Sequence, residues 1–295
     1  MHLARKFLSK DQVARIKGRR RHKFSLDKLV FQRVHSRAEL EKAFNLVYQA
    51  YSKKGFVPDQ KPHNMLFSIY SLLPGTVHVM VRSSRCILSN LTAIPSSKVF
   101  GLPMDAVFKP ELDGLRAEGR TLVELSALAT REEYRFRDIF LYQIQALYWY
   151  FIYHGVDDIC ITVNPRHKGY YMQMFPFLEL GPVRYYPRVN APAVGLRGNV
   201  SDALERMMLV DNSLDLNMPL HHCFYELCGM QEQKKEINLG SGGDMQLLLM
   251  YNQLSSEALS YFLDLEPGIV QGLNSDQSSI LRSIYPDIFG PGRLY

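Results

Sequence analysis

The stretch that decides the fold joins three runs of sequence: TLVELSALAT at residues 121–130, IFLYQIQALYWYFIY at 139–153 and VDDICITV at 156–163. The first and third runs are short and rich in aliphatic and β-branched residues, which is typical of strands. The middle run is apolar on nearly every face and ends before Gly155, which is typical of a buried helix. A strand, a helix and a strand in this order predict a crossover in the middle of a mixed α/β sheet.

Sequence on both sides of the crossover predicts further elements. Apolar residues at helical spacing over 37–54 predict a helix, with Ser36 as its N-cap. Residues 101–105 predict a turn, and residues 111–120 are a short charged segment. The other predicted elements are strands at 76–82 and 87–94, a helix from Pro165 to about Phe175 capped by Asn164, and closing strands between Gly181 and Gly198.

Composition narrows the class of protein. The chain has 295 residues, of which 46% are hydrophobic and 22% charged, as in globular proteins. No run reaches the roughly 18 apolar residues that a membrane-spanning helix needs, and residues 1–30 lack the apolar core of a secretory signal. Four cysteines are too few for a disulfide scaffold. We therefore expect a cytoplasmic protein.

Charge is distributed unevenly along the chain. Residues 1–37 hold 12 Lys or Arg and 2 Asp or Glu, net +10, whereas residues 201–295 hold 5 and 13, net −8. The first 30 residues contain few large apolar side chains, so they predict a basic arm able to contact anionic membrane, including the inner membrane. We expect three parts: this arm at 1–30, an α/β domain at 31–200 and an acidic, helical extension at 201–295. Helix-like runs in the extension cover 203–210, 244–254 and 256–263.

A polar loop at the start of the crossover helix suggests an anion site. The loop carries Arg131, Arg135 and Arg137 within seven residues. Backbone N–H groups and the helix dipole converge at a helix N-terminus, so a phosphate suits this position. Three solvated surface arginines are the alternative interpretation, and the spacing alone leaves it open.

Four short motifs occur in order along the α/β part of the chain: GLPMD at 101–105, ELDGLR at 111–116, VELSALA at 123–129 and VNPRH at 163–167. The order of predicted elements between them resembles the GNAT acyltransferase fold. More specifically, the motifs resemble the N-acyl amino acid synthases of the FeeM type, which are relatives of the LuxI-type acyl-homoserine lactone synthases. The resemblance covers about residues 31–198.

The resemblance implies a reaction and its partners. It implies transfer of a long-chain fatty acyl group from the phosphopantetheine thioester of an acyl carrier protein to the α-amine of an amino acid. The carrier protein would deliver the phosphopantetheine, so no cofactor bound to this chain is expected. GNAT members that bind acetyl-coenzyme A have a glycine-rich loop, whereas this chain reads RFRD at 135–138. A loop without glycine wraps a pyrophosphate less closely, which favours a single carrier-linked phosphate held by Arg131, Arg135 and Arg137.

Acyl transfer to an amino acid needs a group that accepts a proton, because an α-amine is mostly protonated near pH 7. Glu124 and His167 are the candidates for this base, and the sequence leaves the choice between them open. Glu124 and Ser126 alternate in phase on one face of the predicted strand, whereas Leu125 and Ala127 face the opposite way. We expect Ser126 to orient the substrate.

The VNPRH motif and the helix after it supply the rest of the predicted site. Arg166 is expected to bind the substrate carboxylate, and Asn164, two positions before it, is expected to contribute to substrate binding. Tyr170 and Tyr171 lie where many GNAT enzymes place the tyrosine that protonates the leaving thiolate. We assign Tyr171 to that step and Tyr170 to substrate binding, with packing in the core as the alternative for both.

The crossover helix has more apolar residues than a surface helix uses. Most of them are expected to pack in the core, and some to form the wall of a tunnel for the acyl chain. The residues concerned are Phe140, Tyr142, Ile144, Leu147, Tyr148, Trp149, Phe151 and Ile152.

A short cluster of metal-ligand residue types lies in the acidic extension. His221, His222 and Cys223 precede Cys228, but no second pair of ligands follows at zinc-site spacing. We therefore expect no metal.

Two alternative functions remain open. The first is an acyl-homoserine lactone synthase that uses S-adenosylmethionine, but those enzymes have an arginine directly after Glu-x-Ser, where this chain has Ala127. The second is a non-catalytic protein that binds nucleic acid or a membrane surface through residues 1–30. Nucleic acid is the less expected partner.

Overall fold

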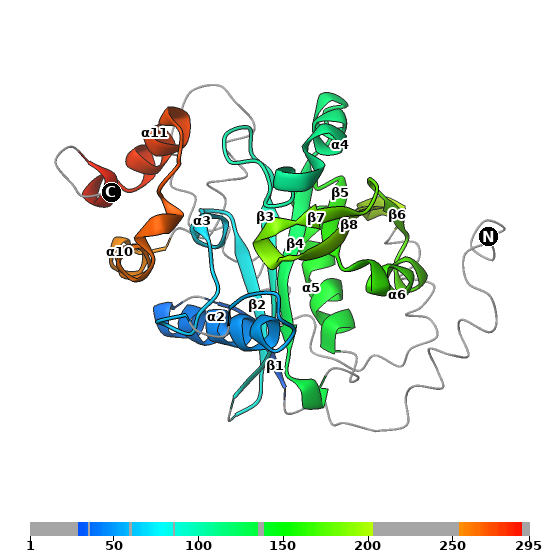
Figure 1. Ribbon diagram of the computed structural model, residues 1–295, viewed down its shortest axis with the longest axis horizontal. Helices are drawn as coiled ribbons and strands as arrows, with labels where there is room; N and C mark the ends of the chain where they lie inside the picture. Colours follow the sequence, from blue (N-terminus) through cyan, green and yellow to red (C-terminus); the bar gives the residue numbers. More distant parts are fainter. Residues whose placement is uncertain are drawn as a thin grey trace.

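The framework of the molecule is a mixed sheet of eight strands (Figure 1). The computed structural model describes residues 29–34, 36–58, 61–84, 86–134, 139–202 and 254–290. The strand order is β1-β2-β3-β4-β5-β8-β6, and β7 pairs with β8. Neighbouring strands are antiparallel except for β4 and β5, which are parallel. The strands are β1 (Val30–Arg33), β2 (Val77–Arg82), β3 (Ile87–Pro95), β4 (Leu122–Thr130), β5 (Asp158–Val163), β6 (Phe177–Glu179), β7 (Arg184–Tyr186) and β8 (Ala191–Asn199).

The predicted crossover is confirmed. Helix α5 (Ile139–Tyr153) joins β4 to β5 and packs on β2 and β3. Leu147 and Phe151 of α5 are fully buried in a core cluster that also contains Val123 and Leu125 of β4. Burial of a side chain of this size contributes roughly 2 kcal/mol, so this cluster fixes α5 to one face of the sheet.

The opposite face of the sheet is covered by α2 (Arg37–Ser52), α3 (Ile69–Leu72) and helices near the C-terminus (Figure 1). As predicted, Ser36 caps α2, and Glu39 completes a capping box with it. The C-terminal helices are α10 (Ser256–Leu265), α11 (Ser275–Ile284) and α12 (Pro286–Phe289). Helix α10 packs through Phe262, whose ring lies 5.3 Å from that of Phe44 and 5.2 Å from that of Phe67.

Several elements were not predicted from the sequence, among them α3, α11 and α12. Two others occupy or adjoin predicted segments. Helix α4 (Asp105–Ala117) occupies the positions of the predicted turn and charged segment, and it contains Pro110 and a break in helical geometry at Phe108. Strand β1 pairs with β2 directly after the predicted basic arm. The helix predicted from Pro165 is present as η4 (Pro165–His167) followed by α6 (Lys168–Met174).

Several predictions fall outside the described residues. They are the basic arm at 1–28, the helix-like runs at 203–210 and 244–253, and the His221–Cys228 cluster. The third helix-like run, at 256–263, is confirmed as part of α10. None of the helices in the described ranges has the length and hydrophobicity needed to cross a lipid bilayer.

Candidate active site

The parallel strands β4 and β5 are paired only over the first four residues of each. Their register runs from Leu122 opposite Asp158 to Leu125 opposite Ile161. Beyond Leu125, β4 contains a bulge: its register with β3 shifts between Asn90 and Thr92, and Ala127 has a φ of 51°. The Nδ2 group of Asn90 donates a hydrogen bond of 3.2 Å to the carbonyl oxygen of Ala127. The two strands therefore separate in the middle of the sheet.

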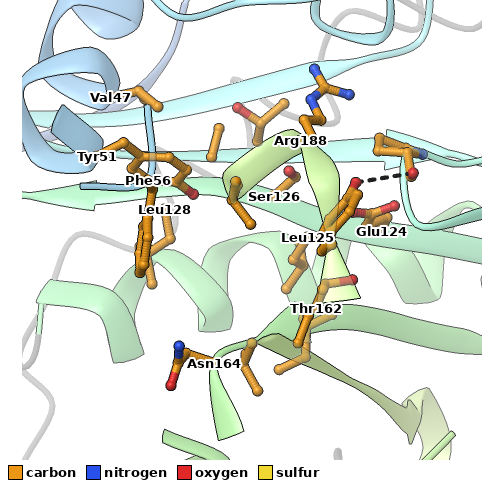
Figure 2. A pocket seen from close by; sticks show the side chains of 18 of the residues that line it. Val47, Tyr51, Phe56, Glu124, Leu125, Ser126, Leu128, Thr162, Asn164 and Arg188 are labelled. Atoms are coloured by element: carbon orange, nitrogen blue, oxygen red, sulfur yellow. Dashed lines mark hydrogen bonds between the residues drawn. The ribbon is translucent and has the colours of Figure 1, made fainter. Parts of the chain in front are cut away.

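A pocket of about 240 Å³ lies where the strands separate (Figure 2). Its wall combines side chains from the α5 side of the sheet, such as Ile144, with side chains from the α2 side, such as Val47. The pocket therefore gives a small molecule access to both faces at the same point. The side chains that line the pocket include Tyr51, Lys54, Phe56, Glu124, Leu125, Ser126, Leu128, Phe140, Ile144, Asn164, His167, Tyr171, Tyr186 and Arg188.

Glu124 is the buried carboxyl group of this pocket. The residue is 2% exposed, and its Oε2 accepts a hydrogen bond of 2.8 Å from the backbone N–H of Met104. Burial raises the pKa of Glu124 to about 8, while the N–H of Met104 and the charge of Arg188 act in the opposite direction. Glu124 is therefore mostly protonated at pH 7 and changes charge close to physiological pH.

The loop that presents Met104 is held by several independent contacts. Gly101 has a φ of 63°, and a Cβ at this position would lie 2.2 Å from Oδ2 of Asp105, so the turn needs glycine. Oδ2 of Asp105 accepts a hydrogen bond of 2.6 Å from the N–H of Leu102 and forms an ion pair of 2.7 Å with Arg116. The hydroxyl of Tyr186 donates to the carbonyl oxygen of Pro103 at 3.0 Å. These contacts give a structural reason for the GLPMD and ELDGLR motifs.

Five of the predicted site residues line this pocket: Glu124, Ser126, Asn164, His167 and Tyr171. Glu124 and Ser126 pair in unbroken register with Ile94 and Thr92 of β3, so they share a side of β4, as expected. The expectation that Leu125 and Ala127 share the opposite side is wrong. Leu125 belongs to the core cluster under α5, whereas Ala127 packs against the cluster under α2, because the bulge reverses the alternation after Ser126.

The VNPRH motif forms the capped turn predicted for it. Oδ1 of Asn164 accepts a hydrogen bond of 3.2 Å from the N–H of Arg166. Nε of Arg166 in turn donates to Nε2 of His167 at 3.1 Å. Partial loss of water around the ring, followed by the charges of Arg166 and Lys54, lowers the pKa of His167. Its ring is therefore neutral at pH 7, with one nitrogen already accepting a hydrogen bond. Arg166 is not among the residues that line the pocket.

The two predicted tyrosines are placed differently. Tyr171 lines the pocket, and its ring lies edge to face with that of Phe140 at 5.9 Å. Burial raises the pKa of Tyr171, so its phenol keeps its proton. Tyr170 is 40% exposed and does not line the pocket.

The predicted anion-binding arginines lie away from this pocket or outside the described residues. Nε of Arg131 donates a hydrogen bond of 2.7 Å to the carbonyl oxygen of Ile87, and Arg131 lines a second pocket of about 590 Å³ beside α2 and the β2–β3 turn. Arg135 and Arg137 lie outside the described residues. Within the described ranges, no group of His, Cys, Asp and Glu side chains is arranged to hold a metal ion.

Sequence reasoning missed several polar residues of the pocket, among them Tyr51, Lys54 and Arg188. Tyr51 was expected only as part of the buried face of α2, and burial raises the pKa of its phenol to about 12. Lys54 follows α2, and Arg188 lies in η5 (Pro187–Val189), the turn between β7 and β8. Their place in the pocket depends on packing between segments far apart in sequence, for which no local pattern exists.

One family model and several solved structures are similar to this chain. The family model of the N-acyl amino acid synthase FeeM matches residues 42–199. The solved structure of FeeM, an N-acyl amino acid synthase from uncultured soil microbes, has 22% identity and a TM-score of 0.54, with 62% of this chain and 97% of that chain covered. BjaI, a coenzyme A-dependent acyl-homoserine lactone synthase, has 15% identity and a TM-score of 0.50, with 62% and 89% covered.

These similarities settle the fold and the family. No curated protein sequence matches this chain. The structural similarities confirm the predicted GNAT-like fold, with an eight-stranded mixed sheet and flanking helices. The family model covers more than half of the 295 residues, and it includes both β4 with Glu124 and the turn with Arg188. The chain belongs to the FeeM family of N-acyl amino acid synthases.

Proposed function

We propose that the protein is an N-acyltransferase that moves a long-chain fatty acyl group from an acyl carrier protein thioester to the α-amine of an amino acid. Membership of the FeeM family supports this class of reaction. The observation that supports it most directly is the position of Glu124, a buried carboxyl with a pKa of about 8 at the point where β4 and β5 separate.

In the proposed reaction, the amino acid loses an ammonium proton to the Glu124 carboxylate, directly or through one water. The free amine then attacks the thioester carbonyl carbon, so that a C–N bond forms and the C–S bond breaks. As the amide forms, its nitrogen loses a second proton. The leaving thiolate takes a proton from the phenol of Tyr171 or from water, and the second proton from the nitrogen restores that group. The products are an N-acyl amino acid and the free phosphopantetheine thiol, and the proton on Glu124 returns to solvent.

Glu124 suits the role of base better than His167 does. A base works best when its pKa lies near the operating pH, and the pKa of Glu124 is about 8. His167 is exposed, its pKa is lowered, and its Nε2 already accepts a hydrogen bond from Arg166.

The α5 side of the pocket supports an apolar acyl donor. Leu125, Leu128, Phe140 and Ile144 line it, and Leu125 and Ile144 are also part of the core cluster under α5. A fatty acyl chain placed there would exclude water from the thioester. The acceptor would then approach from the α2 side, where Tyr51 and Lys54 lie.

The donor's carrier is part of the proposal. An acyl carrier protein is acidic, and the loop from Arg131 to Arg137, directly before α5 in sequence, carries three arginines and two glutamates, net +1. The similar enzyme BjaI is described as coenzyme A-dependent, so acyl-coenzyme A is the alternative donor. We therefore expect phosphopantetheine to enter only as part of the donor.

Reconstitution tests the proposal. The purified full chain is incubated with long-chain acyl carrier protein, or with acyl-coenzyme A, and each amino acid in turn. We expect a product whose mass equals acyl plus amino acid minus water, with the carrier protein as the better donor. Absence of this mass with every amino acid and both donors would refute the proposed function, and a strong preference for acyl-coenzyme A would refute the carrier assignment.

A further inference from the structure

Arg188 is a charged residue of the pocket for which the described residues provide no direct partner. Its guanidinium forms no hydrogen bond or ion pair within the described ranges, although it lines the pocket. By contrast, Arg116, Arg184 and Arg197 are each paired with a carboxylate, at distances from 2.5 to 2.8 Å. A guanidinium has five donors in a planar fork that matches a carboxylate. Arg188 is therefore available for an anionic group of a ligand.

The turn that presents Arg188 is well fixed. Pro187 begins η5, and Asn190 ends it in the left-handed region with a φ of 45°. The hydroxyl of Tyr185 donates to Oδ1 of Asn190 at 2.5 Å. On the other side of the turn, Tyr186 is bound to the carbonyl oxygen of Pro103, the residue before Met104. The turn is therefore tied to the same loop that donates to Glu124.

The charge of Arg188 acts on the Glu124 end of the pocket. It lowers the pKa of Glu124, of Tyr51 and of Tyr186, in each case against the larger effect of burial. Figure 2 shows Arg188 and Glu124 on the same side of the pocket, away from Phe56 and Leu128. An anionic group bound by Arg188 would thus lie near the proposed base and away from the apolar wall.

We propose that Arg188 binds the α-carboxylate of the acceptor and thereby selects α-amino acids over simple amines. In an α-amino acid, the nitrogen and the carboxylate are both attached to Cα, so one binding event would place the carboxylate on Arg188 and the nitrogen toward Glu124. A bidentate pair between guanidinium and carboxylate fixes orientation as well as position. This inference rests on the proposed function, and it replaces Arg166 with Arg188 as the carboxylate ligand.

The experiment compares two acceptors in four proteins. One acceptor is the amino acid that gives most product in the reconstitution, and the other is the amine that lacks only its carboxylate. The proteins are wild type, Arg188→Met, Arg188→Lys and the control Arg37→Met, which removes a half-exposed arginine of α2 that pairs with Glu41. Values of kcat/KM are measured for both acceptors, and KM is measured for the acyl donor.

We expect Arg188→Met to lower kcat/KM for the amino acid about 100-fold, mainly through KM, because a charged hydrogen-bonded pair is lost. Activity with the amine should fall less than activity with the amino acid, because loss of the Arg188 charge raises the pKa of Glu124 for both acceptors, whereas only the amino acid loses a ligand. KM for the donor should change less than about threefold. Arg188→Lys should restore part of the preference, because it keeps the charge without the planar fork. Arg37→Met should resemble wild type. Equal losses with both acceptors, or a raised KM for the donor instead, would overturn the assignment.

A binding measurement separates this inference from the proposed function. Calorimetric titration of the full chain with the same amino acid needs no acyl donor, and all 20 amino acids serve as probes if no turnover is found. Wild type should bind an amino acid and Arg188→Met should bind it at least tenfold more weakly. Binding that Arg188→Met leaves intact, or that Arg166→Met abolishes instead, would overturn the inference, as would the absence of binding in wild type.

Discussion

Glu124 combines two properties that a free carboxylic acid lacks. It is buried, and its pKa is about 8, whereas the usual pKa of a glutamate side chain is near 4.3. An ammonium group entering the pocket would favour the ionised form, as Arg188 already does in part. Substrate binding and proton transfer would thus be coupled at this one side chain.

The first prediction concerns the pH dependence of the reaction. We expect kcat/KM to rise with pH and to level off above about pH 8, because the active form of Glu124 is deprotonated. Glu124→Gln should lower kcat at least 100-fold and remove this rise, since it keeps the shape but cannot accept the proton. Steady-state rates between pH 6 and 9.5 provide the measurement.

His167→Gln is the comparison variant for this prediction. Its loss of activity should be smaller, and its pH profile should keep the rise toward pH 8. A large loss in His167→Gln with near-normal rates in Glu124→Gln would identify His167 as the base.

The second prediction concerns stability. The folded protein retains a proton on Glu124 that the unfolded chain releases between about pH 4.5 and 8, so Glu124 reduces the free energy of unfolding as pH rises through this range. Glu124→Gln removes this dependence. The free energy of unfolding of Glu124→Gln minus that of wild type should grow by at most about 1.4 kcal/mol per pH unit up to pH 8. Above pH 8 this difference should stay constant. Urea unfolding at pH 5, 7 and 9 measures it, and a pH-independent difference would contradict the assigned pKa.

At the scale of elements, the bulge in β4 creates the pocket. Ala127 has a φ of 51°, a region that glycine adopts easily and that β-branched residues avoid. Its neighbour Ala129 lies buried in regular strand pairing opposite Asn90. The same substitution at these two positions should therefore have opposite effects.

The third prediction follows from this contrast. Ala127→Gly should leave stability unchanged or raise it by up to about 1 kcal/mol, whereas Ala129→Gly should lower it by about 1 kcal/mol. Ala127→Val should destabilise by more than about 1 kcal/mol and reduce activity, because the bulge and the separation of β4 from β5 would be strained. Chemical unfolding of the three variants provides the values. Equal losses from glycine at both positions would show that the φ of Ala127 does not matter.

The elements that sequence predicts well are those with a local pattern. The β4–α5–β5 crossover and the capped helix α2 have clear periodicity and end signals, so both are found as predicted. Helix α4 has Pro110 within it and many charged residues, which hide its apolar face. The bulge at Ala127 depends on a contact with Asn90 of β3, which no pattern within β4 reveals.

The same distinction applies to the candidate site. Glu124, Ser126, Asn164, His167 and Tyr171 follow from motifs, and the structure brings all five to one pocket. Their chemical roles stay predictions. Arg188 could not be found in this way, because long-range contacts bring the β7–β8 turn to the pocket. They include the pairing of β8 with β5 and the contact of Tyr186 with Pro103.

At the scale of the whole molecule, the C-terminal helices are part of the core that supports the pocket. Leu259, Phe262 and Leu263 of α10 are almost fully buried, and they share a cluster with Phe44 and Val47 of α2. Val47 also lines the pocket. The position of α2 relative to β4 therefore depends on residues more than 200 positions away in sequence.

The fourth prediction tests this dependence. Phe262→Ala should lower the free energy of unfolding by about 3 to 5 kcal/mol, because it removes a fully buried ring between Phe44 and Phe67. Glu257→Ala, on the exposed side of α10, should change it by less than about 0.5 kcal/mol. Thermal unfolding followed separately by circular dichroism and by activity should give one common transition, lowered in Phe262→Ala. If Phe262→Ala instead left the activity transition unchanged while the dichroism transition split in two, α10 would be an independent unit and the pocket would not depend on it.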